Sequence, residues 1–595
     1  MGAMPAGTDV SAPVADSGEQ SPPTPAGKRA RSRARYVRLA SAAGLAAVLA
    51  ALFFAYLGLS RTYPENSDEA NILLMAWDML HGNVVLHGWY MSDVSFYTTE
   101  LPQYALLESF LGLHADTAHV AAAMTYTLAV VLAVLLAKGQ ASGRVAVVRA
   151  LTAAGILLAP QLGGGVFALD LSVGHLGTSV PLMLVWLLVD RARRRWYVPV
   201  LTAAGLAWVL VADPLVLVIG VLPLALASVA RVIRGVFGAG GLLLALRSRW
   251  YELSLAAAAA AAWGLAWGAE RALAALGGYY LNPLPFTFAS AGDLNRTVVP
   301  ALSSIPLVFG AAFRGLSGVQ YALAVLHVVS LVLVILAVLR VLVRFFGGIT
   351  LVEQVLAVAI VANVAAYALT TAAFQGAHEI AVVVPFGAVL TARMLASPVR
   401  ARRRSRRGWR ARIPAIWAWV PNVWVRVTRA AGYAAGAAVL AGYLAGLAYE
   451  AAQPAAPPAN TALTSWLMGH GLRYGLGGYW ESSIVTVESG GQVDVRSLRL
   501  HSLQRNLWMA KLPWYDPTAN VATFVVLDSG PGYLNNWEPR ALVSRYFGVP
   551  AHVYSFGPYT VLVWNDNLLP LVPPTSSSPS GRPQPPAGPP RSRDG

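Results

Sequence analysis

Long apolar stretches alternate with short polar segments along most of the chain. A helix needs about 20 apolar residues to cross a bilayer. Eleven stretches approach or reach this length: 39–59, 117–137, 147–165, 176–189, 197–212, 214–230, 251–269, 318–339, 351–373, 379–396 and 431–448. The pattern therefore predicts a polytopic α-helical membrane protein with about 11 transmembrane helices.

The basic residues between these stretches predict an orientation. With the N-terminus inside, the inside segments hold 30 Lys and Arg, and the outside loops between spans hold 4. The other 10 follow the last span. Because Lys and Arg accumulate in cytoplasmic loops, we expect a multi-pass protein of the plasma membrane with a cytoplasmic N-terminus and an extracytoplasmic C-terminal region.

Composition divides the chain into four predicted parts. Residues 1–38 are Pro-, Ser- and Arg-rich and are expected to form a disordered, basic cytoplasmic segment. Residues 39–448 form the transmembrane domain, 449–572 an extracytoplasmic α/β domain, and 573–595 a disordered tail. In the α/β domain, strands are expected at Ser483–Val487, Val493–Ser497, Thr523–Asp528, His552–Ser555 and Thr560–Trp564, and helices at 460–471 and 538–547.

Charge and cysteine content exclude several kinds of site. The chain of 595 residues has 12% charged residues, a net charge of +16 and no cysteine. Disulfides, thiol nucleophiles and thiolate metal sites are therefore excluded. The positive charge lies mainly in the inside segments, where it is typical of contact with anionic headgroups. We therefore expect a membrane partner and no nucleic acid.

Acidic residues gather in the first outside loop, residues 60–116. This loop carries eight of the 28 acids and a single basic residue, Arg61. Asp68 and Glu69 begin a helical pattern, where acids stabilise a helix start. The same pair could instead face a cleft between spans, where Asp68 would take a proton from an acceptor hydroxyl. Asp93, Tyr97 and Glu100 are the loop's candidates for acceptor or sugar contact.

A second acid, Asp170, lies in the short loop before the fourth span. Together with Asp68 it could bind a divalent cation such as Mg²⁺ or Mn²⁺ through oxygen ligands. The alternative is a helix cap or an acid satisfied by loop amides. His175, at the end of the same loop, is interpreted as structural.

Few cationic residues are available outside for a lipid phosphate. Arg296, Arg314 and His378 are the candidates, because a phosphate needs one or two such groups. The alternatives are interfacial snorkelling for Arg314 and a local pair with Asp293 for Arg296.

The arrangement resembles the GT-C superfamily of membrane glycosyltransferases, which includes protein O-mannosyltransferases and aminoarabinose transferases. The segment Tyr63–Ala70, continuing to Met79–Asn83, is similar to that family's first-loop pattern of an Asp-Glu pair followed by a helix. The segment Gly174–Thr178 is also similar to bacterial members. The resemblance covers about 39–400, and no basic-aromatic motif is found at the end of the 270–317 loop.

The resemblance implies a metal-assisted, inverting transfer of a sugar from a polyprenyl-phosphate donor to an extracytoplasmic acceptor, which could be a protein, glycan or lipid. It places Asp68 at the catalytic base position, with Glu69 adjacent, and Asp170 at a second acidic position that assists or binds metal. Two alternatives remain: a transporter of lipid-linked glycans, and a non-catalytic scaffold of GT-C type.

Overall fold

The computed structural model describes residues 25–160, 175–238, 246–283, 287–374, 376–396, 420–499, 502–529 and 540–575. The chain divides into two compact units, residues 1–52 and 53–595. In the first unit, the described residues belong to helix α1, Pro25–Ser60. Residues 25–38 are therefore helical, which corrects the expectation of a disordered segment up to residue 38. Their Ala and Arg residues favour a helix that continues into the apolar span.

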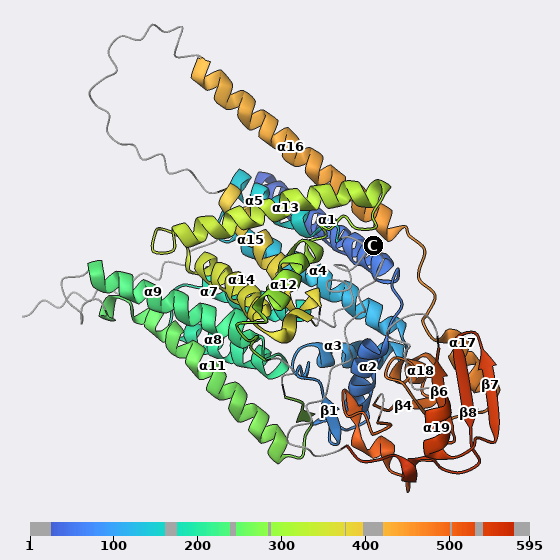
Figure 1. Cartoon of the computed structure of the whole chain (residues 1–595). Coiled ribbons are helices and arrows are strands. Elements are labelled where there is room, and N and C mark those ends of the chain that lie inside the picture. The colour runs from blue at the N-terminus through green and yellow to red at the C-terminus, as the bar shows by residue number, and fades with distance from the viewer. Residues whose placement is uncertain are drawn as a thin grey trace, which may run out of the picture. The chain divides into compact units, whose positions relative to one another are not determined.

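Helices make up most of the second unit (Figure 1). After α1 they are α2 Ser67–Leu80, α3 Glu100–Leu111, α4 Asp116–Lys138, α5 Gly143–Leu157, α7 Leu176–Arg191, α8 Tyr197–Ala212, the π-helix η1 Leu217–Val221, α9 Leu222–Gly238, α11 Trp250–Ala275, α12 Leu294–Val308, α13 Gly318–Val343, α14 Leu351–Leu369, η2 Thr371–Phe374, η3 Ala377–Ile380, α15 Val383–Leu395 and α16 Val420–Ala451.

Seven helices in the described residues are long and apolar enough to cross a membrane. They are Arg35–Ser60, Asp116–Lys138, Leu217–Val236, Gly318–Val343, Leu351–Leu369, Ala377–Leu395 and Ala434–Ala451. The other four predicted spans coincide with helices α5, α7, α8 and α11. Helices α5, α7 and α8, of 15 and 16 residues, reach about 24 Å, which is less than a hydrocarbon core of about 30 Å. Helix α11 has 26 residues and is long enough, but it is not among the seven helices that are also sufficiently apolar. The crossing of these four stays a prediction.

The C-terminal region is an α/β domain, as its composition predicted. Its sheet has the order β4-β3-β6-β8-β7, with β3 parallel to β4 and β6, and β8 antiparallel to β6 and β7. Its elements are α17 Thr461–Gly469, β3 Tyr474–Gly477, α18 Ser483–Glu488, β4 Asp494–Ser497, β5 Ala510–Lys511, η4 Leu512–Tyr515, β6 Phe524–Asp528, α19 Arg540–Phe547, β7 His552–Phe556, β8 Tyr559–Val563 and η6 Leu569–Leu571.

One predicted strand is wrong: Ser483–Val487 forms helix α18. Its apolar residues pack on two sides at once, because Ile484 and Val487 belong to the core around α2 whereas Val485 belongs to the core under the sheet. The strand position is taken by Tyr474–Gly477, where the ring of Phe524 lies so close to Gly475 that a Cβ there would meet it at 2.4 Å.

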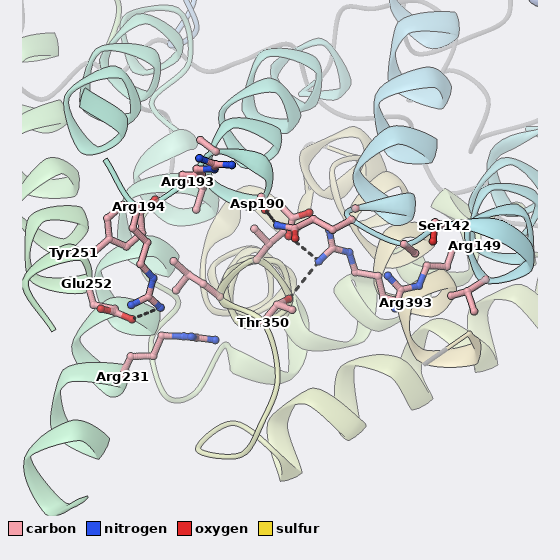
Figure 2. Close-up of a pocket in the computed structure, with 18 residues that line it drawn as sticks. Ser142, Arg149, Asp190, Arg193, Arg194, Arg231, Tyr251, Glu252, Thr350 and Arg393 are labelled. Carbon is pink, nitrogen blue, oxygen red and sulfur yellow. Dashed lines mark hydrogen bonds and ion pairs between the residues drawn. The ribbon is translucent and has the colours of Figure 1, made fainter. Parts of the chain in front are cut away.

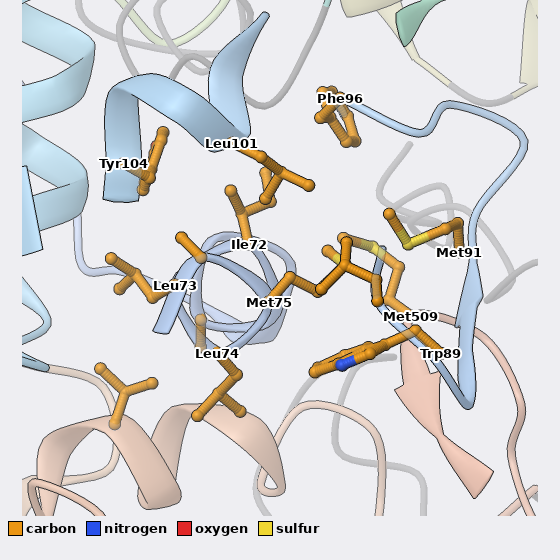
Figure 3. Packing of buried hydrophobic residues seen from close by; sticks show 14 of the residues in the cluster. Ile72, Leu73, Leu74, Met75, Trp89, Met91, Phe96, Leu101, Tyr104 and Met509 are labelled. Atoms are coloured by element: carbon orange, nitrogen blue, oxygen red, sulfur yellow. The ribbon is translucent and has the colours of Figure 1, made fainter. Parts of the chain in front are cut away.

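Helix α2 is the centre of the core outside the predicted spans. Asn66 caps its start in a capping box with Glu69. Ile72, Leu73 and Met75 are buried against residues of α3 and of strand β1, Trp89–Met91 (Figure 3). Strand β1 also pairs with β2, Tyr280–Leu281, and with β5 of the C-terminal domain. The first loop, the 270–317 loop and the C-terminal domain are therefore held together by one small sheet.

Candidate active site

A cavity of about 570 Å³ lies where the predicted outside loops meet. Each of five loops contributes a residue to its wall: Asp93, His175, Asp213, Phe288 and Glu379. The remaining wall is largely apolar, with Val94, Leu215, Leu217, Val218, Ala366 and Tyr367. We refer to this space as the outer cavity, and to Asp93, His175, Asp213 and Glu379 as its acid cluster. One end is thus polar and the rest suits an apolar chain.

His175 is the centre of the acid cluster. Its Nδ1 lies 2.7 Å from Oδ2 of Asp213, and its Nε2 lies 3.2 Å from Oε2 of Glu379. Burial opposes the charged imidazole, but these two carboxylates raise the pKa of His175 well above its ordinary value. The ring is therefore an imidazolium held in a fixed orientation between two acids.

Asp213 is anchored through both of its carboxylate oxygens. Its Oδ2, the oxygen that contacts His175, also accepts a hydrogen bond from the Thr178 hydroxyl at 2.5 Å, and its Oδ1 accepts one from the Leu215 amide at 2.8 Å. Burial disfavours its charged form, but the bonds from His175, Thr178 and Leu215 together keep the pKa of Asp213 below its ordinary value. Asp213 is thus an ionised, fixed partner of the imidazolium.

Asp93 differs from the other acids because no side chain among the described residues donates a hydrogen bond to it. Burial raises the pKa of Asp93 to about 7, the charge of Glu379 adds to this rise, and His175 opposes it. A carboxyl group with a pKa near the working pH is suited to proton transfer. Asp93 therefore combines access to the outer cavity with the acidity of a general base.

Glu100 lies close to the acid cluster but outside the outer cavity. It lines a smaller cavity of about 200 Å³ with Gly177, and a Cβ at Gly177 would meet its Oε1 at 2.0 Å. Its carboxylate accepts a hydrogen bond from Thr99. Burial raises the pKa of Glu100 to about 7. Tyr97 turns elsewhere, because its hydroxyl donates to the Val84 carbonyl at 3.1 Å.

Asp68 and Glu69 lie at the start of α2, away from the residues that line the outer cavity. Oδ1 of Asp68 accepts a hydrogen bond of 2.6 Å from the hydroxyl of Tyr479, in the C-terminal domain. Burial raises the pKa of Asp68, and the Tyr479 bond lowers it in part. Glu69 accepts the Asn66 amide at 2.9 Å and is completely buried. The helix-start function of the pair is therefore present, and a catalytic role for Asp68 stays a prediction.

The three candidate phosphate contacts are not brought together. Arg296 is 78% exposed and pairs with Asp293 at 3.5 Å, three residues earlier. Arg314 is exposed on the loop after α12. His378 alone lies near the acid cluster, with its Nε2 3.5 Å from Oε1 of Glu379.

Asp170 lies outside the described residues, so its proposed pairing with Asp68 stays a prediction. Among the residues that the structure describes, no group of three or more His, Asp or Glu side chains could hold a metal ion. The carboxylate of Asp68 is instead engaged by Tyr479.

Sequence reasoning gave no role to Asp213 or Glu379 and interpreted His175 as structural. A signal was present: Asp213 precedes Pro214 at a turn between two apolar segments, and Glu379 begins another such segment. A carboxylate at the end of an apolar segment needs a partner. Nothing in the pattern indicated that both acids share His175.

Comparisons with known proteins give a structural similarity but no sequence match. No protein-family description and no curated protein sequence matches the chain. It is similar to two crystal structures of the Archaeoglobus fulgidus oligosaccharyltransferase, one tethered to an acceptor peptide containing the NVT sequon and one in complex with Zn and sulfate. Both have 13% identity and a TM-score of 0.43, and the matches cover 81% and 87% of this chain and 68% and 73% of those chains. At these values the likeness assigns neither a family nor a reaction to this protein.

Proposed function

We propose that the protein is a membrane glycosyltransferase that moves a sugar from a polyprenyl-phosphate donor to an extracytoplasmic acceptor in the outer cavity. The observation that carries this proposal is the convergence of Asp93, His175, Asp213 and Glu379 on one cavity whose other walls are apolar. Carboxylates accept hydrogen bonds from sugar hydroxyls, and the apolar wall suits a lipid chain. An amphiphile with a hydroxyl-rich head fits both parts.

In the proposed reaction, Asp93 takes the proton of the acceptor hydroxyl. The acceptor oxygen then bonds to the anomeric carbon as the bond from that carbon to the phosphate oxygen breaks, and the lipid phosphate leaves with the electron pair. The anomeric configuration inverts. His175 is the positive group of the cluster, and it offsets part of the charge that develops on the phosphate.

Asp68 remains a second candidate for the base. It is half-buried, its pKa is raised by burial, and among the described residues its one side-chain donor is the Tyr479 hydroxyl. Asp93 would act in the outer cavity, whereas Asp68 would act beside Tyr479, which donates to its Oδ1.

The test compares Asp93→Asn, Asp68→Asn and the exposed control Asp566→Asn in the full chain, purified in detergent. Release of polyprenyl phosphate from radiolabelled polyprenyl-phosphate mannose, glucose and arabinose is measured with and without membrane acceptors. We expect Asp93→Asn to lower the rate by about 10²-fold or more. The wild-type rate should rise as the pH increases through about 7, because the base must be deprotonated.

The outcomes separate the candidates, provided that thermal unfolding shows each variant to be folded. A loss confined to Asp68→Asn would move the base to Asp68. Transfer that is unchanged in both variants, or a wild-type chain that releases no lipid phosphate from any donor, would reject the proposed function.

A further inference from the structure

A second, larger cavity lies at the opposite, predicted cytoplasmic ends of the helices. Its volume is about 960 Å³, and its wall comes from the start of α5 and the loop before it, the end of α7 and the loop after it, α9, and the starts of α11 and α14, with one residue from α15. Five arginines line it: Arg149, Arg193, Arg194, Arg231 and Arg393. Against them stand two acids, Asp190 and Glu252, which leaves a formal excess of three positive charges. We call this space the arginine pocket (Figure 2).

The inner wall of the arginine pocket is fixed by hydrogen bonds. Arg393 forms a bidentate pair with Asp190, at 3.0 and 2.7 Å, and its side chain is 3% exposed. Arg231 donates through Nε to Oε1 of Gln354 at 2.5 Å and through Nη2 to the Ile349 carbonyl at 2.6 Å. These bonds hold both guanidinium groups in place before any ligand binds.

One buried donor in the arginine pocket lacks an acceptor within the described residues, and a second arginine lacks a carboxylate partner there. The buried Nε of Arg149 has no hydrogen-bond partner. Arg231 uses two of its nitrogens on an amide and a carbonyl, and it makes no ion pair with a carboxylate in the part of the chain that the structure describes. A buried donor without a partner is energetically unfavourable. An anion with several oxygens would satisfy these groups.

The entrance of the arginine pocket is formed by exposed side chains. Arg193 and Arg194 lie on the exposed loop after α7, and Arg194 reaches Oε1 of Glu252 at 3.2 Å while its side chain stays 56% exposed. In Figure 2, Arg194 and Arg231 extend toward the same space beside Glu252. Arginines that only set the membrane orientation would extend toward headgroups. Here Arg231 and Arg393 are part of the wall, and Arg193 and Arg194 lie at the entrance.

We propose that the arginine pocket binds a phosphate-bearing anion at the cytoplasmic end of the helices. The planar donors of arginine match phosphate oxygens in a bidentate manner, and the charge excess and the orphaned Arg149 donor select for an anion. The ligand is either the headgroup of an anionic lipid or a soluble phosphate compound, since both present the same oxygens. This site shares no lining residue with the outer cavity, so the inference does not rest on the proposed transfer reaction.

The experiment uses the full chain in neutral detergent with two probes. Inorganic pyrophosphate is titrated by calorimetry, and phosphatidic acid is compared with phosphatidylcholine by native mass spectrometry. Binding is measured for Arg231→Gln, Arg193→Gln and the control Arg195→Gln, which makes the same charge change in the same loop but does not line the pocket. We expect Arg231→Gln to weaken binding about tenfold, as for loss of one charged hydrogen-bond partner, and Arg195→Gln to leave it unchanged.

Saturable binding of pyrophosphate with the expected losses supports the pocket and identifies a soluble phosphate compound. Binding of phosphatidic acid alone, with the same losses, supports it and identifies a lipid headgroup. Arg193→Gln keeps the test valid if Arg231→Gln does not fold, because Arg193 makes no hydrogen bond or ion pair with the described residues. Absence of saturable binding of both probes, or equal binding by Arg193→Gln and Arg195→Gln, would overturn the proposal.

Discussion

The acids of the first outside loop differ in what neutralises each of them. Asp116 forms a bidentate pair with Arg61, Glu65 pairs with His119 at 2.9 Å, and Asp78 accepts from Lys511 at 2.8 Å. These contacts remove most of the repulsion that the loop's composition implies. Asp93 and Glu108 have no such partner, and burial raises the pKa of both. An acid without a partner is therefore the informative one, and sequence alone does not distinguish it from the others.

Glu108 allows a direct test of how an acid without a partner affects stability. Both of its carboxylate oxygens are buried without a hydrogen-bond partner, and burial raises its pKa to about 9. The folded chain therefore holds a proton that the unfolded chain releases near pH 4.5, so stability falls as the pH rises from about 4.5 to about 9. Glu108→Gln removes this loss. We expect its advantage over wild type to grow across that range, to about 6 kcal/mol at pH 9, because a tenfold difference in proton affinity corresponds to about 1.4 kcal/mol.

The measurement is the thermal unfolding midpoint of wild type and Glu108→Gln from pH 5 to pH 9, with the exposed Asp566→Asn as control. A difference that stays constant with pH would show that Glu108 does not carry the proton assigned to it.

Helix α2 connects the membrane-proximal loops to the C-terminal domain. Its predicted start is confirmed, since the helix begins at Ser67 and carries Asp68 and Glu69 in its first turn. Asn66 and Glu69 form a capping box there, and Ile72, Leu73 and Met75 are buried. Its partner was not predicted. Helix α18 packs against it, with Ser483 donating to Asn71 at 2.6 Å and Tyr479 placed between Asn71 and Asp68. The same contact explains why Ser483–Val487 is a helix and not the expected strand.

Tyr479→Phe tests this interface. The change removes the hydroxyl that donates to Asp68 and that accepts from Asn71 at 3.1 Å, and it leaves the half-buried carboxylate of Asp68 without this donor. We expect a loss of about 1–3 kcal/mol in stability, measured as a lower unfolding midpoint and faster proteolysis near residue 453. Tyr554→Phe is the matched control, because the Tyr554 hydroxyl makes no hydrogen bond with the described residues. Equal effects of the two variants would exclude a special role for Tyr479.

Across the whole molecule, two cavities lie at the two predicted membrane faces, and each has its own chemistry. The outer cavity has acids on an apolar wall, and the arginine pocket is strongly basic. This separation follows the charge pattern of the sequence, since the segments that hold 30 of the 44 basic residues are those assigned to the inside. The orientation itself stays a prediction from the positive-inside rule.

The absence of native cysteine permits a clean test of this orientation. Arg195→Cys and Asn565→Cys both place a thiol at an exposed position. A membrane-impermeant maleimide should label Asn565→Cys in intact spheroplasts, and Arg195→Cys only after permeabilisation. The wild-type chain is the unlabelled control. The reverse pattern would invert the topology and would place the arginine pocket outside.

The helical segments, the start of α2 and the α/β nature of the C-terminal region could be predicted from the sequence, because apolar periodicity, first-turn acids and strand patterns are local properties. The pattern also indicated Asp93 and Glu100 among the candidates. Which acids share a cavity depends on the three-dimensional packing: His175 and Glu379 are 204 residues apart, and Asp68 meets Tyr479 across 411. Such pairings depend on how helices pack and how loops cross between them, and no local pattern of residues encodes a contact over that separation.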